Sequence, residues 1–179
     1  QLSAPETLLD DKGRRIFFGW IREAQPWEQL RSSGWASVMT LPRLLSLAED
    51  GILRIEPVPE LEALRLNNRR WSDIQLTSEM VIERASGNCL ELIAEFDPGT
   101  ATTFGIKVQC SPDGAEETTV VCIPEGNTLT IDFSKSTLDK ALKYPRFTSH
   151  DESEGLDDAD RYTHTQQAPF ELADGERLK

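Results

Sequence analysis

Hydrophobic and polar residues alternate along the second half of the chain. From Cys89 to Phe96, hydrophobic side chains occupy every second position and two glutamates fall between them. The stretches Phe104–Cys110 and Leu129–Phe133 repeat this pattern. A period of two is typical of strands that bury one face and expose the other. Turns rich in Gly, Pro, Asp and Asn separate these stretches, so the pattern predicts two packed antiparallel sheets.

Short β-strands are also expected in the first 56 residues. The turn Asp10–Gly13 precedes one apolar run, and the turn Glu49–Gly51 separates two others. Four strands follow from these signals, at Arg15–Ile21, Ala36–Leu41, Leu44–Ala48 and Ile52–Glu56. Four consecutive antiparallel strands form one blade of a β-propeller.

Residues 57–70 differ from both regions. Pro57 and Pro59 interrupt the strand pattern, and leucines mixed with charged residues follow them. This composition predicts a linker with a short helical turn. The chain therefore divides into a blade at residues 1–56, the linker at residues 57–70 and a β-sandwich at residues 71–179.

The overall charge excludes one class of partner. The chain has 19 Lys and Arg residues against 31 Asp and Glu residues, which gives a net charge of −12. Such a surface repels phosphate backbones, so we expect no nucleic-acid partner. No apolar run reaches the length of a membrane helix, and no signal peptide is visible, so the sequence assigns no compartment.

Cysteine and histidine residues are too few for a zinc site. The chain has two His residues and the cysteines Cys89, Cys110 and Cys122, with no Cys-x-x-Cys pair. We expect three buried thiols, which weakly favours a reducing compartment, although a disulfide between Cys110 and Cys122 is an alternative. No metal or cofactor is expected.

An acidic stretch follows His150. Six of the ten residues from Asp151 to Asp160 are acidic. A solvated loop is the simplest interpretation, and a calcium site is the alternative because calcium prefers clustered carboxylates. The spacing does not fit an EF-hand loop.

Two Gly-Trp pairs, Gly19-Trp20 and Gly34-Trp35, carry a family resemblance. GRRIFFGWIREA followed by GWASVMTLPRLLSL resembles the fifth propeller blade of glycoside hydrolase family 32, which includes invertases, levanases and inulinases. ILRIEPVPELEALR resembles the link between the two domains of that family, and LELIAEFD and THTQQAPFELADGERLK resemble strands of its β-sandwich. Residues 144–160 look like an insertion. The resemblance implies an all-β fold: the last blade of a five-bladed propeller, then part of an antiparallel β-sandwich.

The resemblance implies a substrate-binding role for Trp20. It implies that Trp20 lines a fructose-binding pocket, where an indole face can cover the C–H edges of a sugar ring. A place in the core of the blade is the alternative. We expect Trp35 to pack between strands, and Arg22 and Glu23 could lie at the rim of the pocket.

Catalytic residues of the family cannot be assigned to this chain. Retaining hydrolysis of a fructoside needs a nucleophilic carboxylate and an acid/base carboxylate. The resemblance places them in Asn-Asp-Pro and Glu-Cys motifs, with a further Asp in Arg-Asp-Pro, and the sequence contains none of the three. We therefore expect a segment of a longer enzyme, which needs propeller blades 1–4 and acts on sucrose, levan or inulin.

Two other roles stay open. A non-catalytic carbohydrate-binding β-sandwich is the alternative function, with Trp71 and Phe147 as its candidate aromatic residues. A structural role for residues 71–179 is compatible with the enzyme, either by stabilising the propeller or by forming a contact in a homo-oligomer.

Overall fold

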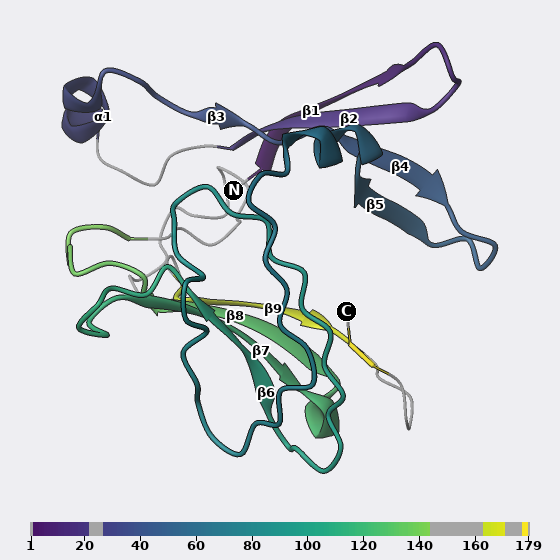
Figure 1. Cartoon of the computed structure of the whole chain (residues 1–179). Helices are drawn as coiled ribbons and strands as arrows, with labels where there is room; N and C mark the ends of the chain where they lie inside the picture. The colour runs from purple at the N-terminus through teal and green to yellow at the C-terminus, as the bar shows by residue number, and fades with distance from the viewer. Residues whose placement is uncertain (1, 22–26, 144–162, 171–176, 179) are drawn as a thin grey trace. The chain divides into compact units, whose positions relative to one another are not determined.

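The computed structural model describes residues 2–21, 27–143, 163–170 and 177–178. Its chain forms two compact units, Gln1–Ala85 and Ser86–Lys179, and each is described by itself. Across the described residues the secondary structure is almost entirely β, with one short α-helix and two 3₁₀ turns (Figure 1). The all-β prediction is confirmed.

A five-stranded antiparallel sheet forms the body of the first unit. Its strands lie in the order β1-β2-β4-β5, and the short β3 also pairs with β2. Their bounds are β1 Leu2–Leu9, β2 Arg15–Ile21, β3 Val38–Met39, β4 Arg43–Leu47 and β5 Leu53–Pro57. Helix α1, Trp27–Ser33, lies between β2 and β3 in the chain.

The two predicted hairpin turns are present. Asp10 accepts hydrogen bonds at Oδ1 from the main-chain N–H groups of Lys12, at 3.0 Å, and Arg14, at 2.8 Å. Gly13 has a φ of 74°, a conformation that a glycine adopts without strain. These bonds fix the turn between β1 and β2, so the strands that follow it start in a defined register.

Three predictions for the first unit need correction. The strand expected at Ala36–Leu41 is reduced to Val38–Met39, and neither α1 nor β1 was predicted. Strand β1 contains Pro5 within an irregular register between Ser3 and Glu6, which hides it from a search for alternation. Its pairing with β2, a tertiary contact, makes it a strand.

The predicted helical turn in the linker is confirmed as the 3₁₀ helix η1, Pro59–Leu64. Pro59 suits the start of a helix because the missing N–H group is not needed there. The N–H of Arg65 donates to the carbonyl of Glu62 at 3.1 Å and closes the turn. Val58, directly before η1, is buried at 7% exposure, and its N–H donates to the carbonyl of Pro42.

A four-stranded antiparallel sheet forms the second unit, in the order β6-β7-β8-β9. The bounds are β6 Phe104–Val108, β7 Glu117–Ile123, β8 Thr128–Lys135 and β9 Thr165–Pro169, with the 3₁₀ turn η2 at Pro124–Gly126. Cys122 is the most deeply buried of the described side chains, at 1% exposure. The rings of Phe96 and Phe104 lie 5.3 Å apart.

The strand predicted at Cys89–Phe96 is wrong for most of its length. Only Phe96 pairs, in an isolated bridge with Leu178, and Leu90, Leu92 and Ile93 are more than half exposed. Alternation makes a segment able to pair, but a strand also needs a neighbour to receive its hydrogen bonds. In the described part of the chain, residues 89–95 take part in no strand pairing.

The cysteine prediction is also corrected. Cys122 is buried as expected, but Cys89 and Cys110 are exposed, and all three thiols are free. Cys122 pairs with Phe104 at the first residue of β6, whereas Cys110 lies two residues beyond Val108, the last residue of that strand. The two thiols therefore lie at opposite ends of the hairpin, and the alternative of a disulfide between them is wrong.

Candidate functional site

Trp20 lies near the end of the central strand β2. It is opposite Ser3 of β1 on one side and Met39 of β3 on the other. Its side chain is 40% exposed in this chain, so it is not enclosed by the strands of its own sheet. The indole is therefore placed at a surface, where it can contact another molecule or another part of the protein.

The backbone beside Trp20 is held by a buried hydrogen-bond pair. The N–H of Gly19 donates to Oγ1 of Thr40 at 3.0 Å, and the N–H of Thr40 donates to the carbonyl of Gly19 at 2.8 Å. Thr40 is only 5% exposed. Because a buried donor without an acceptor is costly, this reciprocal pair fixes the segment that carries the indole.

Gly19 has a steric role. A Cβ atom at this position would lie 2.8–2.9 Å from three atoms of the Leu2 side chain, closer than carbon atoms approach without strain. The leucine of β1 therefore packs directly over the glycine on β2. The Gly-Trp pair combines a residue that leaves room for the Leu2 side chain with a residue that supplies a large aromatic surface.

The surroundings of Trp20 suit contact rather than proton transfer. The residues paired with Trp20 and Ile21 in the register are Leu2, Ser3, Val38 and Met39, none of which is acidic. Met39 shares the face of the sheet with Trp20 and is 65% exposed, whereas Ile21 and Val38 point to the opposite face. Trp20 and Met39 can cover an apolar face of a ligand, and neither cross-strand partner of Trp20, Ser3 or Met39, is an acid or a base. Arg22 and Glu23, the candidate rim residues, lie outside the described residues.

The prediction that Trp35 packs between strands is wrong. Trp35 follows α1 and precedes β3, and its side chain is 56% exposed. It borders a shallow hollow of about 350 Å³, whose other lining residues are Leu30, Arg31, Gly34 and Ala36. Helix α1 explains the difference, because it takes residues 27–33 out of the β pattern and leaves the second Gly-Trp pair in a loop.

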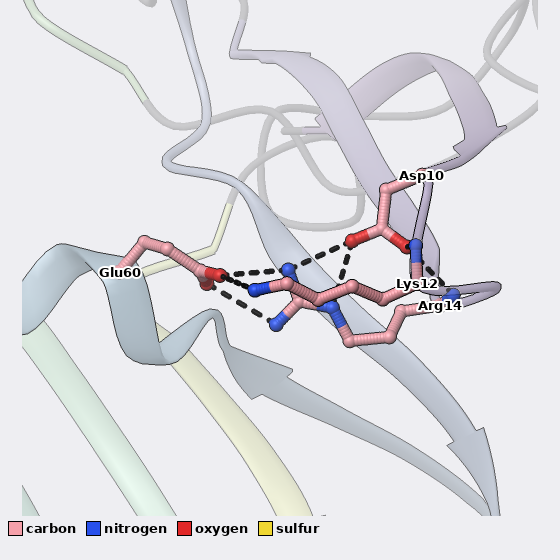
Figure 2. Close-up of polar contacts among 4 residues, drawn as sticks. All are labelled: Asp10, Lys12, Arg14 and Glu60. Atoms are coloured by element: carbon pink, nitrogen blue, oxygen red, sulfur yellow. Dashed lines mark hydrogen bonds and ion pairs between the residues drawn. The ribbon is translucent and has the colours of Figure 1, made fainter.

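A cluster of four charged residues connects the β1–β2 turn to η1 (Figure 2). Arg14 donates to Glu60 through both terminal nitrogens, at 2.7 Å to Oε1 and 3.3 Å to Oε2. Its Nε donates to Oδ2 of Asp10 at 2.8 Å, and Lys12 Nζ lies 3.3 Å from Oε1 of Glu60. One guanidinium therefore holds two carboxylates in fixed directions.

The hydrogen bonds of this cluster shift the protonation of its members. The hydrogen bonds from Arg14 lower the pKa of Glu60 to about 2. Hydrogen bonds to Glu60 and then to Asp10 raise the pKa of Arg14. Partial burial acts to raise the pKa of Asp10, but its hydrogen bonds with Arg14 and Lys12 outweigh burial and lower it. All three groups are thus charged over a wide pH range.

A smaller polar group lies on the sheet of the second unit. Glu117 of β7 bridges Lys107 at 3.2 Å and Lys135 at 3.5 Å. It borders a hollow of about 130 Å³ together with Thr119, Asp132, Ser134 and Lys135. The hydrogen bond with Lys107 is the main cause of the lowered pKa of Glu117. The opposite charges balance one another, and the arrangement fits cross-strand pairing on a solvated face.

The described residues contain no candidate metal site and no candidate membrane-spanning helix. Among them, no three His, Cys, Asp or Glu side chains converge on a point that could hold an ion. The acidic stretch at residues 151–160 and Phe147 lie outside the described residues. No helix of the described chain is long and apolar enough to cross a membrane.

The sequence indicated Trp20, but it did not indicate the Gly19–Thr40 hydrogen bonds that hold the backbone beside it. Thr40 gave no signal because a threonine next to a short strand is common, and its partner Gly19 is 21 residues away. The role of Glu60 was hidden for the same reason, since its partner Arg14 is 46 residues away. The charged residues of the β1–β2 turn and of the linker can be read from the sequence. That they lie close enough to form ion pairs depends on the fold.

Profiles of one protein family match both halves of the chain. The family profile described as "Glycosyl hydrolases family 32 N-terminal domain" matches residues 1–57, and "Glycosyl hydrolases family 32 C terminal" matches residues 60–179. The chain is 34% identical over 103 residues to the levanase of Bacillus subtilis (strain 168), covering 54% of this chain and 15% of the levanase. It is 31% identical over 133 residues to a sucrose-6-phosphate hydrolase of Staphylococcus xylosus, covering 74% of this chain and 26% of that protein.

Solved structures share the fold. The structure of fructan 1-exohydrolase IIa from Cichorium intybus matches 96% of this chain and 36% of its own, with a TM-score of 0.61 and 18% identity. A complex of its E201Q variant with 1-kestose matches 79% of this chain and 34% of its own, with a TM-score of 0.58 and 20% identity. The chain thus spans only about a sixth to a quarter of the levanase and the sucrose-6-phosphate hydrolase, and about a third of the solved chain.

Proposed function

The chain belongs to glycosyl hydrolase family 32, and we propose that it forms part of an enzyme that hydrolyses β-fructofuranosides such as sucrose, levan or inulin. The names of its relatives support this substrate class, since they include a levanase, a β-fructofuranosidase and fructan 1-exohydrolases. In this proposal, residues 1–56 are the last blade of the catalytic propeller, and residues 71–179 belong to the β-sandwich.

The proposed reaction is a double displacement with net retention. One carboxylate forms a covalent fructosyl intermediate, and a second acts first as general acid and then as general base. The family motifs for these carboxylates are absent from the sequence, so this chain supplies no catalytic residue. The rest of the propeller, blades 1–4, would supply both groups.

Trp20 is the substrate-binding residue of this chain in the proposal. The observation that carries this role is a 40% exposed indole at the end of β2, on a backbone held by the Gly19–Thr40 pair. An aromatic face next to apolar side chains can cover the C–H edges of a fructosyl ring. An indole at the surface can make such a contact, whereas a tryptophan in the core of the blade would be enclosed.

The second unit has a structural role in the proposal. Its described sheet has a polar face with cross-strand ion pairs and an apolar side that includes Cys122 and Phe104, with the ring of Phe96 beside Phe104. Neither side of this sheet presents an exposed aromatic side chain among the described residues. Trp71, the described aromatic candidate, is 45% exposed but belongs to the unit of residues 1–85 rather than to this sheet. Stabilisation of the propeller therefore fits this unit better than the gripping of a polysaccharide.

The test measures fructose release by the full-length enzyme from sucrose, inulin and levan. Trp20→Ala is compared with Trp35→Ala, which removes a more exposed indole, at 56% against 40%, from the same unit. Loss of an aromatic contact predicts a decrease in kcat/KM of about tenfold or more for Trp20→Ala. Trp35→Ala should stay close to wild type.

Two results would contradict the proposal at different levels. Full activity in a folded Trp20→Ala enzyme would place Trp20 in the core of the blade and leave the substrate class intact. A folded wild-type enzyme that releases no fructose from any of the three would reject the hydrolase. Retention on insoluble levan would then favour the carbohydrate-binding module.

A further inference from the structure

We infer that Glu60 anchors residues 58–65, the segment in which the second family region begins, to the β1–β2 hairpin, through a receptor formed by Asp10, Lys12 and Arg14. This anchoring does not depend on which saccharide the enzyme hydrolyses. It gives Glu60 a positioning role that follows neither from the fold class nor from the proposed reaction.

The position of Glu60 in the chain suggests the task. The N-terminal family profile ends at residue 57, and the C-terminal profile starts at residue 60. Glu60 is therefore at the start of the second region, while its partners Lys12 and Arg14 belong to the first. Their interaction ties the segment that leaves the blade back to the hairpin at its beginning.

The receptor on the hairpin has hydrogen bonds of its own, which do not involve Glu60. Asp10 is fixed by the N–H groups of Lys12 and Arg14, and it holds the Arg14 guanidinium at 2.8 Å through Nε. The side chains of Asp10 and Arg14 are 16% and 27% exposed, so this part of the cluster is largely shielded. A guanidinium held in this way loses little conformational freedom when it donates to a second carboxylate, so more of the binding energy is retained.

The segment itself needs an external anchor. Helix η1 has six residues, and short 3₁₀ helices have poor hydrogen-bond geometry. None of its residues is buried. Val58 provides one fixed point, since it is buried and bonded to Pro42. Glu60 provides the second, two residues later, and two fixed points define the direction in which the chain continues.

The same helix offers a matched control. Glu62 is also in η1, but it pairs at 3.3 Å with Arg65, a residue of its own turn. A Glu62→Gln substitution removes a carboxylate and an ion pair without touching the hairpin. The comparison of Glu60→Gln with Glu62→Gln therefore separates anchoring from a general effect of lost charge.

The test is hydrogen–deuterium exchange of the full-length enzyme, read at the amides of Leu61 and Arg65. Both N–H groups donate within the segment, to Val58 and Glu62 respectively. Glu60→Gln should increase their exchange rates about two- to fivefold, which is the range expected for a partly exposed ion pair, while Glu62→Gln should leave Leu61 unchanged. Equal exchange at Leu61 in both variants would overturn the inference.

Two hairpin variants keep the test decisive if Glu60→Gln does not fold. Arg14→Lys preserves the charge but removes the two-point contact, so exchange at Leu61 should rise although residue 14 is far away in the sequence. Lys12→Met removes the more exposed partner, whose side chain is 63% exposed, and should have a smaller effect. Exchange unchanged in Arg14→Lys would overturn the inference independently.

Discussion

The Arg14 guanidinium and the Glu60 carboxylate meet at 2.7 Å although 46 residues separate them. Arg14 closes the first turn of the blade, and Glu60 lies in the 3₁₀ helix that follows its last strand. The first and last parts of the first sheet are thus joined by a charge-assisted contact (Figure 2). This contact has a pH dependence that stability measurements can detect.

Acidification should weaken the contribution of Glu60. Its pKa is about 2 in the folded chain and roughly 4.3 in an unfolded chain, so the folded state favours the charged form. A group with a lowered pKa contributes stability above its unfolded pKa and loses it as the pH falls towards its folded pKa. The difference in Tm between wild type and Glu60→Gln should therefore be largest at pH 6–7 and shrink between about pH 5 and pH 2.

Thermal unfolding of the full-length enzyme at pH 7, 5, 4 and 3 measures this difference. Glu62→Gln is the control, since its partner Arg65 belongs to the same turn. A Tm difference for Glu60→Gln that stays constant from pH 7 to pH 3 would contradict the assignment. It would mean that the substitution acts through packing rather than through the carboxylate charge.

The hydroxyl of Thr40 should matter more than its methyl group. Thr40→Val keeps the shape but leaves the buried N–H of Gly19 without an acceptor, which costs about 1–3 kcal/mol. Thr40→Ser keeps the hydroxyl and should lose less. Because Gly19 precedes Trp20, Thr40→Val should also lower kcat/KM on sucrose. Denaturant unfolding and sucrose assays of both variants test this, and equal stability of the two would show that the bond contributes little.

The three thiols should react at different rates. Cys89 and Cys110 are exposed, whereas Cys122 is 1% exposed and burial raises the pKa of its thiol. Since the thiolate is the reactive form, a thiol reagent should modify Cys89 and Cys110 in the native protein and Cys122 only after unfolding. Mass spectrometry of tryptic peptides after labelling identifies the modified residues. Rapid native labelling of Cys122 would show that the sheet of the second unit opens readily.

Local sequence signals were sufficient to predict the turns, strands and helices that are specified by residues close together in the chain. Asp10 and Gly13 specify a turn through short-range bonds and a positive φ, and the run Arg15–Ile21 after them became β2 as expected. The prolines of the linker set a short 3₁₀ helix. These features depend on residues within a few positions of one another, so the chain order alone contains the needed information.

Tertiary structure decided the features that need a distant partner. Strand β1 exists because β2 receives its hydrogen bonds, while residues 89–95 alternate correctly and stay outside the described sheet. The sequence offered Trp20 as a binding residue and Glu60 as one of many acids. Only the fold brings Thr40 to Gly19 and Arg14 to Glu60, because hydrogen bonds and ion pairs depend on distance in space and not on distance along the chain.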